Sequence, residues 1–117
     1  MTIGEIKESL NATVLACEDK LNNEVYSAFA SDMMSDTLAF AKDVSILLTG
    51  LCNSQVMRTA DLLDIECIIF IRGKEPTENM IELAISNDIC VLSTNYEMYV
   101  ACGILYNTNA IGGVDIG

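Results

Sequence analysis

Two short apolar runs with a helix-like segment between them dominate the pattern of hydrophobic and polar positions. Residues 44–49 and 67–71 form the runs, and apolar side chains recur at helical spacing from Val56 to Leu63. Runs of this length, bounded by polar turns, are typical of strands buried on both faces, as in parallel sheets. Asn53 and Ser54 both offer an N-cap for the helix. Because parallel strands need such a crossover, the pattern predicts one strand–helix–strand unit with the two strands side by side.

The flanking segments continue the alternation of strands and helices. Thr2 with Glu5, and Thr94 with Glu97, are spaced as capping boxes, and Ser31 is placed to cap a further helix. The pattern predicts, in chain order, a helix at 2–10, strands at 13–17 and 25–30, a helix at 31–41, a helix opened by Pro76 or Thr77 and ended by Asn87, a strand at 89–92 and a last helix ending near Tyr106. In the helix after Pro76, the residues expected to face the core are Met80, Ile81, Ala84 and Ile85.

This order of elements predicts an α/β fold. We expect a three-layer α/β/α single domain, with a largely parallel sheet of about five strands, over residues 1–106. Residues 107–117 contain three glycines and two asparagines, and we expect them to form an irregular C-terminal tail.

The apolar content, 51% of 117 residues, is high for so short a chain. A small domain with surplus apolar surface usually covers part of it against a partner, so we expect a homodimer. The helix at 31–41 is apolar on two sides, with Met34, Leu38 and Ala41 on one stripe and Met33, Thr37 and Phe40 on a second. The expected interface residues are Met33, Met34, Thr37, Leu38 and Phe40.

The net charge of −11, with six basic residues, disfavours two classes of partner. Nucleic-acid backbones and anionic membranes are bound by clustered lysines and arginines, so neither is expected here. The lack of histidine removes histidine-based triads and most zinc sites. No bilayer-spanning run and no secretory signal is expected. Five cysteines without a C-x-x-C motif indicate buried thiols in a reducing cytoplasm.

Three polar loops are expected to meet at one edge of the sheet, beyond the carboxyl ends of the strands, where open α/β folds bind ligands. Three of the six basic residues lie in or near these loops, which points to a small anionic ligand such as a nucleotide or phosphate. The candidate ligand-binding residues are Thr49, Gly50, Asn53, Arg58, Arg72, Gly73, Lys74 and Thr94. The alternative is a purely structural role, because any α/β domain needs glycines and helix caps at these turns, and Arg58 could pair with Asp61.

The candidate loops contain no catalytic constellation. Gly50 and Gly73 are isolated, without the spacing of a phosphate-binding loop. Asp32 is better placed to cap a helix beside Ser31, and Cys52 in the first loop has no base partner. The cysteines expected in the core are Cys17, Cys67, Cys90 and Cys102. We therefore expect no catalytic residue, no metal and no cofactor.

Several of these segments resemble the DRTGG domain family. The resemblance is carried by Leu47-Leu48-Thr49-Gly50, the helix to Leu63, the run from Cys67 to Gly73, Pro76 and the run from Ile89 to Thr94. DRTGG domains occur alone, between the CBS domains of some pyrophosphatases and in some phosphate acetyltransferases, and they are similar to the N-terminal domain of HPr kinase/phosphatase. The resemblance implies a three-layer α/β fold, frequent dimerisation and a regulatory role.

The chain departs from the family pattern at both of its motifs. The family's Gly-Asp-Arg corresponds to Gly50-Leu51-Cys52, and its Thr-Gly-Gly corresponds to Arg72-Gly73-Lys74, so one glycine of each motif is kept. If the missing side chains contact a ligand in other members, this chain binds a different ligand or none.

The sequence thus predicts a non-catalytic regulatory or ligand-sensing domain. It is expected to form a homodimer and to bind a small anionic ligand or nucleotide at the strand-end loops. The alternative is a protein-interaction or dimerisation module without a small-molecule ligand, which docks a partner enzyme or a second copy through the helix at 31–41.

Overall fold

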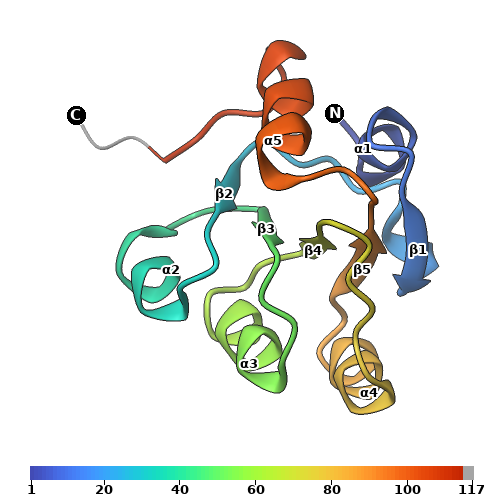
Figure 1. The fold of residues 1–117 in the computed structure, drawn as a ribbon, viewed down its shortest axis with the longest axis vertical. Coiled ribbons are helices and arrows are strands. Elements are labelled where there is room, and N and C mark those ends of the chain that lie inside the picture. The colour runs from blue at the N-terminus through green and yellow to red at the C-terminus, as the bar shows by residue number, and fades with distance from the viewer. Residues whose placement is uncertain (115–117) are drawn as a thin grey trace.

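A five-stranded sheet lies between two layers of helices in the computed structural model, which describes residues 1–114 (Figure 1). The elements in chain order are α1 (Ile3–Ser9), β1 (Thr13–Ala16), a 3₁₀ turn η1 (Glu18–Lys20), β2 (Ala28–Ala30), α2 (Met34–Phe40), β3 (Ile46–Thr49), α3 (Ser54–Leu62), β4 (Cys67–Phe70), α4 (Glu78–Ser86), β5 (Cys90–Ser93) and α5 (Met98–Asn107). The predicted α/β fold with three layers and a largely parallel sheet is confirmed.

The strand order is β1-β5-β4-β3-β2. Strands β2, β3, β4 and β5 run parallel to one another, and β1 pairs with the outer side of β5 in the antiparallel direction. The central prediction is confirmed, because Ile46–Thr49 and Cys67–Phe70 pair in parallel along their whole length. The carboxyl ends of β2, β3, β4 and β5 therefore lie at one edge of the sheet, which we call the carboxyl edge. We call the opposite edge the amino edge.

Alternate residues of the buried strands serve two separate cores. On one face, Leu48 and Ile69 pack with α1 and α5. On the other face, Leu47 and Ile68 pack with α2, α3 and α4. Figure 1 shows the same division, with α1 and α5 on one side of the sheet and the other three helices on the opposite side. Strands that are apolar at every position follow directly from this double burial.

Three of the predicted helix starts are confirmed. Thr2 and Glu5 form a capping box, in which each side chain accepts a hydrogen bond from the other residue's backbone N–H. Asn53 caps α3 by accepting the N–H of Val56. Thr77 caps α4 in the same way, so the start predicted at Pro76 or Thr77 is also confirmed.

Two predicted caps are wrong. Helix α5 begins after Glu97, and the Thr94 hydroxyl instead donates to the carbonyl of Leu10 at 2.7 Å. Helix α2 begins after Met33, and Ser31 accepts the Met33 N–H in the preceding turn. In both cases the hydroxyl satisfies a backbone group outside the helix that follows it.

Helix α2 buries a different set of side chains from either predicted stripe. Met34 and Thr37 are almost fully buried, so these two expected interface residues are not on the surface. Met33, Leu38 and Phe40 are 59%, 41% and 56% exposed. The helix is apolar on both sides, so its sequence alone did not show which side faces the sheet. In α4, Ile85 was expected to face inward, but it is 61% exposed because Met80 and Ala84 fill the core side.

The second strand is shorter than predicted. Only Ala28–Ala30 form β2, which pairs with β3 on one side. On its other side, Gly112 exchanges backbone hydrogen bonds with Tyr26 and Ala28, and Ile111 is buried in the core with α1 and α5. The segment after α5 thus extends the sheet beside β2. No helix within the described residues is long and apolar enough to cross a membrane.

Candidate functional site

The carboxyl edge brings Gly50 and Arg72 into direct contact. A Cβ atom on Gly50 would lie 2.7 Å from Nη2 of Arg72, so the guanidinium lies over this turn in the space that a side chain at position 50 would occupy. Both Arg72 and Lys74 are exposed. The three ion pairs among residues 1–114 involve the N-terminal amine, Lys7 and Lys20, and none involves Arg72 or Lys74. Two cationic side chains therefore remain available at the exits of β3 and β4.

Asp32 also belongs to this group, and sequence analysis assigned it a different role. Its Oδ1 accepts the N–H of Gly50 at 2.7 Å and the hydroxyl of Thr49 at 3.3 Å. Asp32 therefore does not cap α2. It ties the loop after β2 to the loop after β3. Its Oδ1 would lie 3.4 Å from a Cβ atom on Gly50, so this carboxylate and the Arg72 guanidinium are both near Gly50. The signal that could have found it is its position just after a strand parallel to β3.

The loops after β4 and β5 are joined by backbone hydrogen bonds. The N–H groups of Arg72 and Gly73 donate to the carbonyls of Tyr96 and Thr94, both at 2.8 Å. Arg72 and Gly73 both have positive φ, at 55° and 66°. Because these two N–H groups are already paired, an anion at this edge would be held by side chains rather than by a backbone nest.

The other predicted site residues have structural roles as well as their place near this edge. Thr49 and Thr94 are buried, and their hydroxyls bond to protein groups. Asn53 is exposed at the start of α3, where it caps the helix. Arg58 is exposed on α3 and forms no ion pair with Asp61 in the part of the chain that the structure describes.

A pocket of about 430 Å³ opens at the same edge, beside β1 and β5. Its wall includes Gly73, which is the one predicted site residue that lines it. The other lining residues are Asn11, Thr13, Leu15, Glu75, Pro76, Ile81, Ser93 and Asn95. These residues were not among the predicted site residues, because the pocket depends on the antiparallel placement of β1, which no local sequence pattern specifies.

Cys52 lies close enough to Lys74 to be affected by its charge. Burial raises the pKa of the Cys52 thiol above its ordinary value, and the positive charge of Lys74 lowers that pKa by a smaller amount. The thiol is therefore protonated at neutral pH. This protonation disfavours Cys52 as a nucleophile, because the thiolate is the reactive form.

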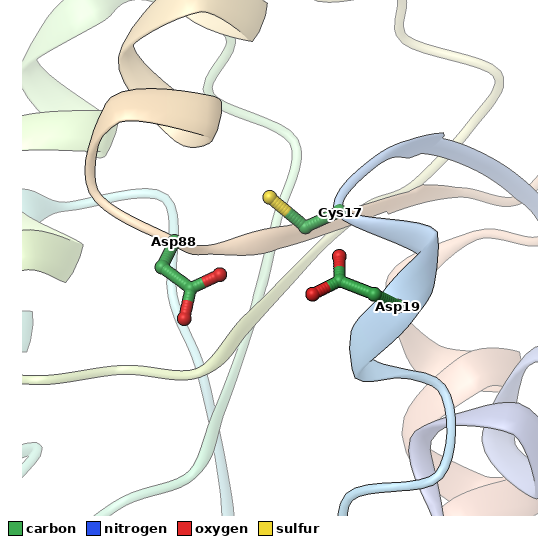
Figure 2. Close-up of side chains that lie close together, drawn as sticks. All are labelled: Cys17, Asp19 and Asp88. Carbon is green, nitrogen blue, oxygen red and sulfur yellow. The ribbon is translucent and has the colours of Figure 1, made fainter.

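The amino edge carries a cluster of Cys17, Asp19 and Asp88 (Figure 2). Their ligand atoms all lie within 4.8 Å of one another, and the carboxylates of Asp19 and Asp88 face each other. Lys20 already balances this charge, because its Nζ lies 3.6 Å from the Asp88 carboxylate and donates to the Asp88 carbonyl at 2.7 Å. Burial raises the pKa of the Cys17 thiol, and the carboxylates of Asp88 and Asp19 raise it further, so a metal would have to displace a proton.

Comparison with known proteins gives a protein family and a similar solved structure for this chain. The model of the DRTGG domain matches residues 5–107. The chain belongs to the DRTGG domain family. The two glycines that this member keeps from the family motifs, Gly50 and Gly73, both lie at the carboxyl edge.

One similar solved structure contains the CBS and DRTGG domains of the regulatory region of Clostridium perfringens pyrophosphatase, complexed with the activator diadenosine tetraphosphate. The TM-score is 0.71 at 19% sequence identity, and the match covers 89% of this chain and 45% of that one. At this identity the similarity supports the shared fold, and the chain spans less than half of the pyrophosphatase regulatory region. No curated protein matches the chain.

Proposed function

We propose that this DRTGG domain is a non-catalytic sensor that binds a small anionic ligand, such as a phosphate ester or nucleotide, at the carboxyl edge. The observation that carries the proposal is the exposed Arg72 guanidinium, which lies over Gly50 where β3 and β4 end and forms no ion pair among the described residues. Lys74 adds a second positive charge nearby.

The charge of the whole molecule makes this position distinctive. With a net charge of −11, most of the surface repels anions, so a phosphate is attracted only where basic groups gather. A guanidinium offers two parallel N–H donors to a phosphate, which makes arginine suited to such binding. The related regulatory region of a pyrophosphatase forms a complex with a nucleotide activator, which makes nucleotides the first ligands to test.

Isothermal titration calorimetry tests the proposal with a panel of nucleotides, including diadenosine tetraphosphate, together with pyrophosphate and inorganic phosphate. We expect at least one of these anions to bind, and Arg72→Ala to weaken binding by about tenfold or more, as loss of a charged hydrogen bond does. Lys42→Ala is the matched control, because Lys42 is also an exposed cation but precedes β3 at the amino edge. No binding across the panel, or equal losses in the two variants, would contradict the proposal.

We further propose that the domain acts as a homodimer in a reducing cytoplasm. The five cysteines are all free, which fits a reducing compartment. The exposed group of Met33, Leu38 and Phe40 on α2 is the surface that supports the second candidate function, a dimerisation or partner-docking module.

Light scattering of Leu38→Asp tests the dimer, with the expected result that the variant is monomeric while wild type is dimeric. Met34→Asp is unsuitable as the test, because Met34 is buried and a charge there would destabilise the monomer itself. An unchanged assembly state in Leu38→Asp would contradict α2 as the interface.

A further inference from the structure

The pocket beside β1 lies where the chain leaves the sheet in two opposite directions. After β4 the chain enters α4, which packs on the face covered by α2 and α3. After β5 it enters α5, which packs on the other face with α1 (Figure 1). Open α/β sheets bind ligands at such a point, outside the carboxyl ends of the strands.

The walls of this pocket are fixed by hydrogen bonds between the two loops. The Ser93 hydroxyl donates to the carbonyl of Lys74 at 3.0 Å, and the Gly73 N–H donates to the carbonyl of Thr94. A Cβ atom on Gly73 would lie 2.9 Å from Oδ1 of Asn95, which also lines the pocket. Glycine at this position therefore preserves space inside a preformed pocket, whose volume of about 430 Å³ suits a small molecule.

The chemistry of the lining differs from that of the neighbouring cationic group. The pocket contains amide and hydroxyl groups from Asn11, Thr13, Ser93 and Asn95, together with the carboxylate of Glu75. Its apolar surface comes from Leu15, Pro76 and Ile81. Among residues 1–114, no lysine or arginine lines it, although Arg72 and Lys74 alternate with Gly73 and Glu75 along the same loop. The interior thus suits an uncharged group with hydrogen-bond donors and an apolar body, while a phosphate is favoured just outside it.

From this division we infer that the ligand is bipartite, with an uncharged, hydrogen-bonding head in the pocket and a phosphate on Arg72 and Lys74. A nucleoside monophosphate has this chemistry, since its base has a flat apolar body and polar edges. Glu75 is the specificity-determining residue, because its carboxylate accepts a hydrogen bond from the head. The inference rests on the proposed function and adds the class of ligand and the second half of its site.

The test is calorimetric titration of wild type with the four ribonucleoside 5′-monophosphates, the corresponding nucleosides and inorganic phosphate. We expect one monophosphate to bind at least about tenfold more tightly than either inorganic phosphate or its own nucleoside. Glu75→Gln should weaken binding of that monophosphate by about tenfold. It should leave the affinity for inorganic phosphate within about threefold of the wild-type value.

Glu78→Gln is the matched control, because it also removes one negative charge, but Glu78 lies in the first turn of α4 and does not line the pocket. It should leave both affinities within about threefold of wild type. A second variant, Thr13→Tyr, places a ring in the mouth of the pocket at an exposed position of β1 and should abolish the preference for the monophosphate.

The failures of the two proposals are distinguishable. If inorganic phosphate and every monophosphate bind equally, and binding depends on Arg72 but not on Glu75 or Thr13, the bipartite ligand is refuted and the anion sensor stands. If neither phosphate nor any monophosphate binds, the anion sensor is refuted, and the bipartite ligand with it.

Discussion

The two edges of the sheet contain similar kinds of residues but differ in how their charges are neutralised. At the amino edge, Lys20 is largely buried, pairs with the Asp88 carboxylate and donates to its carbonyl. At the carboxyl edge, Arg72 is exposed and pairs with no carboxylate in the described chain. The comparison teaches that a cluster of titratable groups is not by itself a site. A site is indicated where charges remain unpaired beside an open pocket.

The contrast between the two edges depends most on Lys20, which we expect to stabilise the amino edge. Lys20→Met should destabilise the domain by about 1–3 kcal/mol, because it removes a charged hydrogen bond and leaves the Asp88 carboxylate without its cation. Urea unfolding measures this loss. Lys42→Met, at an exposed lysine without an ion pair among residues 1–114, should change stability by less than about 0.5 kcal/mol. Equal effects of the two substitutions would contradict the assigned role of Lys20.

A pair of glycine substitutions sharpens the account of the carboxyl edge. Gly73→Ala should destabilise the domain by about 1–2 kcal/mol, because φ is +66° at this position and the new methyl group would press on Asn95. Gly103→Ala in α5 should stabilise by about 0.5–1 kcal/mol, because no atom lies within 4 Å of its added Cβ. Thermal unfolding of both variants measures whether each substitution lowers or raises the stability of the domain. A stabilised Gly73→Ala variant would show that the loop does not need its left-handed conformation.

The smallest expected effects concern Cys17 and Cys52, two partly buried thiols that lie one at each edge. Because burial raises the pKa of both Cys17 and Cys52, their alkylation rates should still be rising with pH above 9, when free cysteine has begun to level off. Lys74→Met removes a charge that lowers the Cys52 pKa, so labelling of Cys52 at pH 8 should slow by about twofold. Asp19→Asn removes a charge that raises the Cys17 pKa, so labelling of Cys17 should become faster.

Mass spectrometry of the labelled peptides gives both rates in one sample. Each thiol is the internal control for the substitution at the other edge. If Lys74→Met changes the labelling rate of Cys17 as much as that of Cys52, the effect reflects a global change in the fold and not the loss of a local charge.

Much of the fold could be predicted because its signals are local. Double burial of β3 and β4 appears directly as runs of apolar residues, and the caps at Thr2, Asn53 and Thr77 bond only within their own first turns. The failures involve distant partners. The Thr94 hydroxyl bonds to a carbonyl 84 positions away, so its spacing from Glu97 had no bearing on its role.

The candidate site was predictable only in outline, for the same reason. Parallel strands place their exits together, which brought Gly50 near Arg72 as expected. The role of Asp32 and the walls of the pocket depend on how β2 and β1 are added at the two outer sides of the sheet. Strand order is decided by packing across the whole domain, so no short motif recorded it.

The most direct test of the account is to map where ligand contacts the domain, using the backbone amide signals of ¹⁵N-labelled protein during titration with the tightest-binding nucleoside monophosphate. The account predicts that the signals of Gly50, Gly73 and Asn95 move, while those of Asp19 and Asp88 stay in place. Shifts centred on Asp19 and Asp88, or no shift at the carboxyl edge at saturating ligand, would contradict it.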